Sequence, residues 1–500
     1  MKKALLIFLA LLMVTSCLVS CNEREPDTSV TDTSRAEGEQ GFNPETQRYE
    51  TNLPEFSWDL SQGGYATFDV AVTSDENQST YYSEEIGFDK YSTTDEVIND
   101  AVMKRNHLVQ ELTGVEIVAH YVANVVTAVE DDIATGTGKY DMAMPFIHNA
   151  VTLAQESLLY DLRDDSFSEY LNLDMPWWDQ SANTTFSVDG KLYFTTGDIT
   201  IMTKINTWAI TFNKEMYATL FPGEKSLYEI VEDGDWTFDK LVEFSKAATK
   251  DNGDGTWDLN DQWGLISAYS DARNYYTASG ESLAEKDAKD LPYIAFNNER
   301  SVSIAQDVLE QFSQVNTWHI YTNTLPVASP WVTALDMFAG GQVLFRTSVF
   351  SAIKKLRKYD DGIEFGIVPL PKYDENQDKY YSPSDPAGYA VVIPINAEDP
   401  EFSAYMTELV CCEAKNYLTP AYYETTLKHR DARDDESEVM LDLIFDNKKF
   451  DIGAIYNFGG LADMFSQLAS AGSSDIVSKF ESISNTVDED IQETITNFGD

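Results

Sequence analysis

Basic residues are scarce in this chain of 500 residues, with 35 Lys and Arg against 84 Asp and Glu and a formal net charge of −49. A nucleic-acid-binding surface needs clustered Lys and Arg to neutralise phosphates, so nucleic acid is excluded as a partner. The chain is not a disordered acidic tail either, because 43% of its residues are hydrophobic and 12% aromatic. Its length predicts roughly two to four domains of about 150 residues.

Cysteine is also scarce, with four in the whole chain. Cys411 and Cys412 are adjacent, and a disulfide between neighbours strains the peptide. They also lack the spacing of a zinc site. We therefore expect them to pack on a helix, in a protein without a disulfide framework.

Enzyme motifs are missing. The sequence contains no HExxH, no Walker A loop and no GxSxG, and its histidines (His107, His120, His148, His319 and His429) are scattered without metal-like spacing. A glycosidase needs two carboxylates at a defined separation, which a sequence this acidic cannot show. We expect no enzymatic activity, and a surface-anchored glycoside hydrolase remains the alternative.

The N-terminus has the pattern of an export signal. A basic start, Lys2-Lys3, precedes an apolar run over 4–14 that is too short to span a membrane comfortably. Leu18-Val19-Ser20-Cys21 resembles the lipobox of bacterial lipoproteins. That resemblance implies a signal peptide over 1–20, a lipid on Cys21 and a place on the extracellular face of the cell membrane. Cys17 and an ordinary secretory signal are the alternatives.

Residues 21–57 are rich in Glu, Asp, Thr and Ser, which predicts an acidic flexible tether. The folded body is expected from Trp58. Strands over 65–73, 115–122 and 140–144 alternate with helices over 93–112, opened by Thr93 and Glu96 at capping-box spacing, and 124–134. This alternation predicts an α/β lobe with a mostly parallel sheet.

The later chain shows the same kinds of segment with looser order. Strands are expected at 191–194, 207–212, 343–345, 365–368 and 390–393, and helices at 236–248, 302–314, 401–415 and 436–444. No repeat of about 20–50 residues is present.

One segment resembles a calcium loop. Oxygen-bearing side chains surround a glycine turn, namely Asp251, Asn252, Asp254, Asp258 and Asp261. Lys250 occupies the position that should hold the first ligand. The acidic side chains predict a structural Ca²⁺ as the only cofactor, whereas Lys250 favours the alternative of a solvated turn.

Aromatic residues are abundant, with 9 Trp and 27 Tyr. Several adjoin expected strand or helix ends: Trp177, Trp178, Trp208, Trp331 and Phe350. Aromatic rings can stack on the apolar faces of sugars while polar groups fix the hydroxyls. The alternative for each ring is a place in the core, where most of the tryptophans are expected.

Several segments in order resemble family 1 extracellular solute-binding proteins, the receptors of carbohydrate-type ABC importers. They are 140–142 with 158–162, 190–194 with 212–214, 338–342, and Phe365-Gly366-Ile367-Val368-Pro369-Leu370-Pro371. The resemblance spans roughly 65–460. It implies a two-lobe α/β fold of the type II periplasmic-binding-protein kind, with a ligand cleft between the lobes. Lobe 1 would be 58–205 plus 389–418, lobe 2 would be 206–388 plus 419–500, and hinges would lie near 204–208, 387–390 and 418–422.

The resemblance also implies a site. Phe146 and His148 follow a strand, where α/β sheets bind ligands. The other expected contacts are Asp198, Asn206 and Trp208 around the first hinge, Phe350, and Asp385 before the second hinge. Trp208 is the expected stacking ring, and Asp198 and Asp385 are the expected hydroxyl acceptors. The implied partners are an oligosaccharide and an ABC permease, and a non-sugar solute in the same fold is the alternative.

Overall fold

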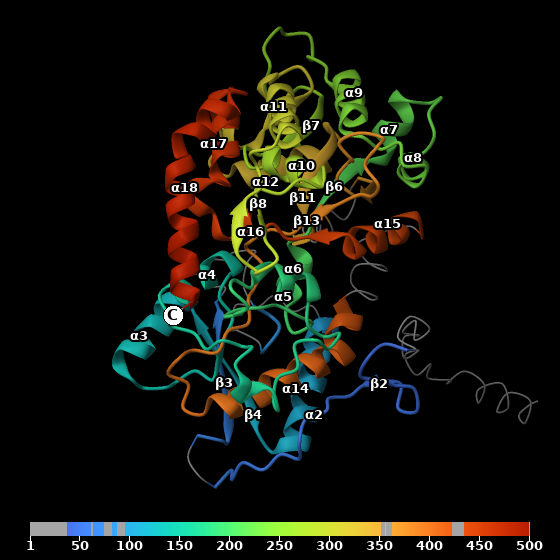
Figure 1. Cartoon of the computed structure of the whole chain (residues 1–500). Coiled ribbons are helices and arrows are strands. Elements are labelled where there is room, and N and C mark those ends of the chain that lie inside the picture. The colour runs from blue at the N-terminus through green and yellow to red at the C-terminus, as the bar shows by residue number, and fades with distance from the viewer. Residues whose placement is uncertain are drawn as a thin grey trace, which may run out of the picture.

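The computed structural model describes residues 38–61, 64–74, 83–87, 96–351, 356, 363–422 and 435–499. The expected signal peptide, Cys21 and the Thr93 cap lie outside these residues. Two lobes lie one above the other in Figure 1, with β3 and β4 in the lower lobe and β6, β7 and β11 in the upper lobe. Within the described ranges, no helix is both long and apolar enough to cross a membrane.

Lobe 1 contains a parallel three-stranded sheet in the order β4-β3-β5. The strands are β3 (Thr67–Thr73), β4 (Glu116–Val122) and β5 (Met142–Ala143), and the connecting helices are α2 (Glu96–Thr113) and α3 (Val125–Thr135). Asn124 caps α3 at its start, and Gly136, at φ 64°, ends it in the left-handed conformation that glycine adopts readily. The expected β-α-β-α-β order is confirmed.

Helix α14 (Pro400–Pro420) packs on α2 and carries the paired cysteines. Cys411 and Cys412 are free and fully buried, which confirms them as packing residues. The start of the helix is set by Asp399, whose side chain accepts hydrogen bonds from the N–H groups of Glu401 and Phe402.

Lobe 2 contains a five-stranded sheet in the order β10-β7-β11-β6-β12. Its strands are β6 (Trp208–Asn213), β7 (Trp263–Ser267), β10 (His319–Tyr321), β11 (Val343–Val349) and β12 (Phe365–Val368). Strands β10, β7 and β11 are parallel, and β6 runs antiparallel to β11. The carboxyl ends of the three parallel strands therefore share an edge with the start of β6.

The helices of lobe 2 surround this sheet. They are α7 (Lys214–Leu220), α8 (Leu227–Glu232), α9 (Phe238–Ala248), α10 (Asp271–Ala278), α11 (Glu299–Ser313) and α12 (Pro330–Ala339). Thr237 caps α9 through a hydrogen bond from the N–H of Lys240. The expected helices over 236–248 and 302–314 are confirmed.

The remaining elements are short or lie near the lobe boundary. They are α4 (Ile147–Gln155), α5 (Gln180–Phe186), α6 (Ile201–Ile205), the hairpin β8 (Ala284–Lys286) and β9 (Pro292–Ile294), β13 (Ser382–Pro383), α15 (Asp435–Asp446), β14 (Lys448–Lys449), α16 (Ile452–Tyr456), α17 (Asp463–Ala471) and α18 (Ile476–Gly499), with 3-10 turns at Asp165–Phe167, Thr322–Thr324 and Phe458–Gly460. The strands expected at 191–194 and 390–393 are isolated bridges instead, in which Val391 pairs with Thr195 and Val392 with Ala143.

The chain crosses between the lobes in neighbouring segments. Thr207 forms a bridge with Ser384, and the N–H of Asp385 donates to the carbonyl of Asn206 at 2.8 Å. The N–H of Ser384 donates to the carbonyl of Lys449 at 2.9 Å, so a later segment joins the same place.

The C-terminal segment contacts both lobes, so assigning all of 419–500 to lobe 2 is incomplete. Helix α17 packs on α10 and α11 of lobe 2. Helix α18 runs down one side of the molecule to the lower lobe (Figure 1), where Gln155 of α4 donates to Thr494 at 2.8 Å. The rings of Tyr193 and Phe498 lie 4.8 Å apart.

The expectation of a flexible tether up to residue 57 is wrong for residues 38–57. Strands β1 (Phe42–Asn43) and β2 (Arg48–Tyr49) form a hairpin against α14. The guanidinium of Arg48 pairs with Glu413 at 2.5 Å. The rings of Phe56 and Tyr405 lie 5.5 Å apart, so an aromatic residue of this acidic segment packs on the helix.

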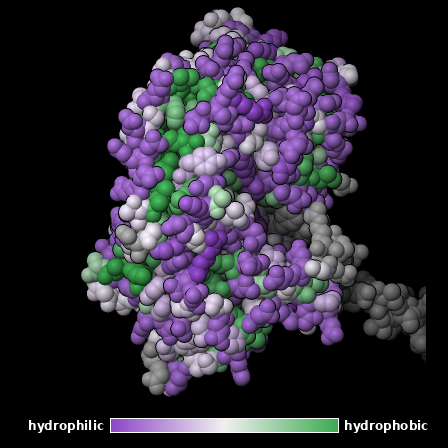
Figure 2. All heavy atoms as spheres, in the orientation of Figure 1, coloured by the Kyte–Doolittle hydropathy of each residue, from purple (hydrophilic) through white to green (hydrophobic). Residues whose placement is uncertain are grey.

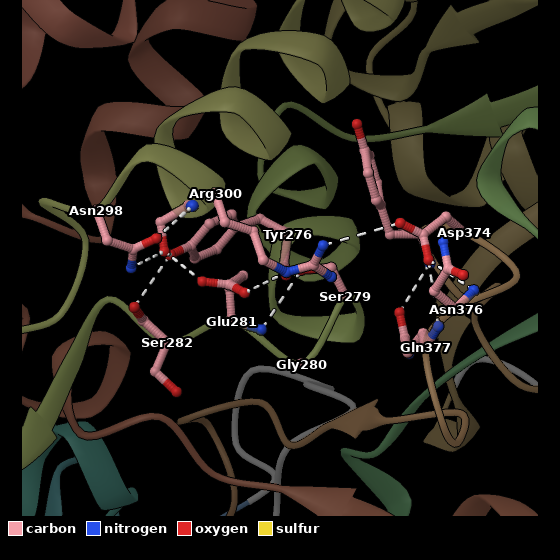
Figure 3. A network of polar contacts seen from close by, with 12 residues as sticks. Tyr276, Ser279, Gly280, Glu281, Ser282, Asn298, Arg300, Asp374, Asn376 and Gln377 are labelled. Atoms are coloured by element: carbon pink, nitrogen blue, oxygen red, sulfur yellow. Dashed lines mark hydrogen bonds and ion pairs between the residues drawn. The ribbon is translucent and has the colours of Figure 1, made fainter.

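A polar network ties α10 to its neighbours (Figure 3). Arg300 of α11 donates from Nε to Glu281 at 2.9 Å and lies 3.8 Å from Asp374 through Nη1. Tyr276 of α10 donates its hydroxyl to the carbonyl of Ser282 at 3.0 Å. The hydrogen bond of Tyr276 holds α10, which begins at Asp271, against the segment that follows the helix. The face shown in Figure 2 is mostly hydrophilic with separate apolar patches, as the acidic composition requires.

Candidate functional site: a cavity at the lobe 2 sheet edge

A cavity of about 480 Å³ opens at the carboxyl ends of the parallel strands of lobe 2. Ser267, Thr322 and Val349 contribute from the ends of β7, β10 and β11, and Trp208 contributes from the start of β6. Open α/β sheets bind ligands outside these strand ends. The volume lies in the range of about 300–1,000 Å³ that is usual for small-molecule sites.

Two tryptophans form the aromatic part of the cavity. Trp208 is half-buried, and its Nε1 donates to Oδ2 of Asp385 at 3.2 Å. Trp331 is 57% exposed on the first turn of α12, where Pro330 starts the helix. Both side chains line the same cavity, so they offer apolar ring surface to one ligand.

Asp385 connects the cavity to the crossing segments. Its Oδ1 accepts the N–H of Ala387 at 2.9 Å and its Oδ2 accepts Trp208, while its own N–H binds Asn206. A carboxylate has about four lone-pair sites, so both oxygens can still accept a ligand hydroxyl. A ligand bound here therefore contacts the hinge directly.

The floor of the cavity is charged and polar. Asp271, Arg346, Thr347 and Ser348 all line it and are all buried. Thr347 is already hydrogen-bonded to the hydroxyl of Tyr275 at 2.7 Å.

Asp271 is the buried carboxyl of this floor. Burial raises the pKa of Asp271 to about 7, although the N–H of Ala268 and the charge of Arg346 act in the opposite direction. Its Oδ2 accepts that N–H at 2.9 Å. Among the described residues, its Oδ1 and the hydroxyl of Ser348 have no hydrogen-bond partner, although both are buried.

The structure brings Trp208 and Asp385 together in the cavity, and their contact with a ligand stays a prediction. Phe146 and His148 lie on lobe 1 at the start of α4 and do not line it. Their rings stack at 5.7 Å, and Nδ1 of His148 lies 3.0 Å from the carbonyl of Pro386, in the segment that follows Asp385. They therefore lie on lobe 1, beside the segment that follows Asp385 at the cavity wall.

Asp198 lies in a different place. It lines a separate cavity of about 180 Å³ together with Lys204 and Lys415, at 2.9 and 3.6 Å from its carboxylate. Burial alone would raise the pKa of Asp198, but the two ammonium groups outweigh it and hold the pKa at about 2. Its carboxylate is thus engaged by lysines.

Phe350 is a wrong prediction in this conformation. Its ring is fully buried, stacks on Phe445 of α15 at 5.1 Å and does not line the cavity. Asn206 is also fully buried and does not line the cavity. It acts there through its backbone carbonyl, which holds Asp385.

Asp271 and Arg346 were missed by the sequence interpretation. Asp271 follows β7, and Arg346 lies within β11 beyond the expected end of that strand at 345. The signal that could have located Asp271 is the apolar run Trp263–Ser267 after the acidic turn, since it marks a buried strand whose carboxyl end Asp271 follows.

The calcium-like segment forms a turn stabilised by its own side chains. Asp261 accepts the N–H groups of Asn252 and Asp258 at 2.8 and 2.7 Å, and Asp251 accepts that of Gly253 at 2.5 Å. In the part of the chain that the structure describes, no three His, Cys, Asp or Glu side chains are grouped to hold a metal. Calcium binding stays a prediction.

Comparisons with known proteins identify the family and the fold of the chain. The family model described as bacterial extracellular solute-binding protein matches residues 89–409, more than half of the chain, and the chain belongs to that family. Members of the family are binding proteins, in agreement with the absence of enzyme motifs. No curated protein matches the chain.

Solved structures share the fold. A cyclo/maltodextrin-binding protein complexed with maltotetraose has 16% identity and a TM-score of 0.54, over 88% of this chain and 98% of that one. UgpB from Mycobacterium tuberculosis in complex with glycerophosphocholine has 14% identity and a TM-score of 0.56, over 79% and 96%. The apo form of RafE from Streptococcus pneumoniae has 12% identity and a TM-score of 0.51, over 87% and 100%. The two-lobe type II fold is thereby confirmed.

Proposed function

We propose that this protein captures a carbohydrate, an oligosaccharide, between its lobes and delivers it to the permease of an ABC importer. A lipid on Cys21 holds it at the extracellular face of the membrane in this proposal. The observation that carries the proposal is the cavity beside the crossing segments, where two tryptophans and several buried polar side chains meet.

The side chains of the cavity suit a sugar. The rings of Trp208 and Trp331 provide surface for the apolar C–H groups of a pyranose, and Asp385 and Thr347 provide hydrogen-bonding groups for hydroxyls. The fold relative complexed with maltotetraose supports this ligand class. The relative complexed with glycerophosphocholine supplies the non-sugar alternative that an experiment must separate.

Binding is coupled to closure through Asp385. It lies on the segment that crosses between the lobes, and the following residues contact His148 of lobe 1. A ligand that touches Asp385 and both lobes at once binds the closed form better than the open form. The population then shifts toward the closed form by that difference in affinity.

The test is a thermal-shift screen of the purified protein. The panel contains maltotetraose, raffinose and other neutral oligosaccharides, with glycerophosphocholine, a zwitterion, as the non-sugar comparison. A ligand at 100 times its Kd stabilises the folded state by about 2.7 kcal/mol, so a true ligand raises Tm measurably. A rise with glycerophosphocholine and with no oligosaccharide would overturn the carbohydrate proposal.

Turnover distinguishes a receptor from the glycoside hydrolase alternative. The ligand should be recovered unchanged after long incubation, with a stoichiometry of one per chain. Appearance of shorter products would favour the hydrolase, with Asp271 and Asp385 as the carboxyl pair to examine.

A further inference from the structure

We propose that Asp271 selects the ligand, because its unpartnered carboxylate oxygen requires a hydrogen-bond donor from a neutral, hydroxyl-bearing group at the floor of the cavity. This inference rests on the proposed function and deepens it. It assigns the main polar contact to Asp271 on α10, whereas the hinge carboxylate Asp198 is already engaged by lysines.

The two carboxylate oxygens of Asp271 differ in their hydrogen bonds. Oδ2 accepts the N–H of Ala268 at 2.9 Å, which fixes the side chain at the start of α10. Oδ1 is buried and has no hydrogen-bond partner among the described residues. A buried carboxylate oxygen without a donor costs free energy, and a ligand that donates to it would recover that cost.

Among the described residues, no neighbouring group donates a hydrogen bond to Asp271 Oδ1. The hydroxyl of Ser348 lines the same cavity and is also buried without a hydrogen-bond partner in the described chain. Both residues line the cavity wall, where a ligand binds beside them. In this inference ligand hydroxyls accept from Ser348 and donate to Asp271.

The charges around Asp271 restrict the charge of the ligand. The charged groups that act on Asp271 are Arg346 of β11, Arg273 of α10 and Asp385 of the crossing segment. An ammonium on the ligand would satisfy Oδ1 but would face Arg346. A phosphate or carboxylate would suit Arg346 but would face both Asp271 and Asp385. A neutral group with hydroxyls avoids both conflicts.

The discriminating variant is Asp271→Asn, because it changes chemistry without changing shape. The N–H of Ala268 holds the remaining oxygen, so the new amide nitrogen takes the place of Oδ1. The floor of the cavity is thereby converted from an acceptor to a donor, beside the donors of Arg346. We expect Kd to rise about tenfold or more, the size of one hydrogen bond to a charged group.

The matched control is Glu408→Gln. Glu408 of α14 is also a buried carboxyl with a pKa raised to about 7, first by burial, but it accepts Trp178 Nε1 at 2.8 Å and does not line the cavity. Ser348→Ala is a milder second variant and should raise Kd several-fold. For all four proteins, titration calorimetry with maltotetraose and with glycerophosphocholine, and Tm without ligand, are measured at pH 8, above the pKa of about 7 at which Asp271 is half protonated.

The affinities and Tm values separate the role of Asp271 from the proposed function as a whole. Loss of maltotetraose affinity in Asp271→Asn and not in Glu408→Gln supports the inference. Wild-type affinity in Asp271→Asn overturns it while the proposed function stands. Binding of glycerophosphocholine alone overturns both. If neither probe binds the wild type, Tm decides: a higher Tm for Asp271→Asn supports an unsatisfied carboxylate kept for a ligand, and an equal or lower Tm overturns it.

Discussion

Replacing Trp208 with Ala separates a stacking tryptophan from a core tryptophan. The ring is half-buried at the start of β6 and lines the cavity with its remaining surface. If a ligand covers about 50–100 Å² of that ring, the lost burial amounts to about 1.25–2.5 kcal/mol at about 25 cal/mol per Å². Kd should therefore rise about eightfold to seventyfold.

Stability should change less than at a core position. A fully buried Trp→Ala change costs about 3–5 kcal/mol, whereas this ring leaves part of its surface outside the core, so about 1–2 kcal/mol is expected. Trp208→Phe keeps a ring and removes the 3.2 Å hydrogen bond to Asp385, and should weaken binding only a few-fold.

Calorimetric titration with the best oligosaccharide from the screen and denaturant unfolding are measured on each variant. Trp331→Ala should lose affinity at no cost in stability, because its side chain is 57% exposed. Trp257→Ala is the matched control, since this exposed ring packs on Trp263 outside the cavity at 5.2 Å. A Trp208→Ala protein that loses 3 kcal/mol or more, about the full core cost, and keeps its affinity would refute the stacking argument.

Three further predictions concern other parts of the chain. Cys21→Ala should release the protein from membranes into the medium, and continued membrane retention would point to Cys17 instead. Burial raises the pKa of Glu408 from 4.5 to about 7, so the stability it contributes is complete below about pH 4.5 and is lost as the pH rises toward 7. Tm of Glu408→Gln should therefore fall less than wild-type Tm between pH 5 and 8, and equal slopes would contradict the assignment. If the Asp251–Asp261 segment binds Ca²⁺, the ion should raise Tm relative to chelator, and Asp261→Asn should abolish the difference; identical Tm values leave only the solvated turn.

The fold of lobe 1 could be predicted because its signals are local. In β3 the side chains of Phe68, Val70 and Val72 alternate with less buried residues at the start of the strand, and α3 carries its own caps at Asn124 and Gly136. In lobe 2, β7 is buried along its whole length and β10 has three residues, so neither shows alternation. Such strands are defined by the sheet around them.

The candidate site was only partly predictable because its members meet through tertiary contacts. Asp198 and Asp385 are equivalent in sequence terms, as short carboxylates near expected hinges. Lys415, far along the chain, engages the first, while Trp208 brings the second to the cavity. Phe350 follows β11 directly, and packing on Phe445 decides that it faces the core. The place of Asp271 in the cavity depends on the sheet, which brings the carboxyl ends of β7, β10 and β11 together.

The decisive measurement is a structure of the protein bound to the strongest oligosaccharide of the screen, because it shows directly whether the sugar occupies the cavity at the lobe 2 sheet edge. The account predicts one ligand in the cavity, with a sugar ring on Trp208, a hydroxyl within hydrogen-bond distance of Asp271 Oδ1, and the lobes closed on it from the side of Phe146 and His148. A ligand bound outside this cavity, or cleaved within it, would contradict the account.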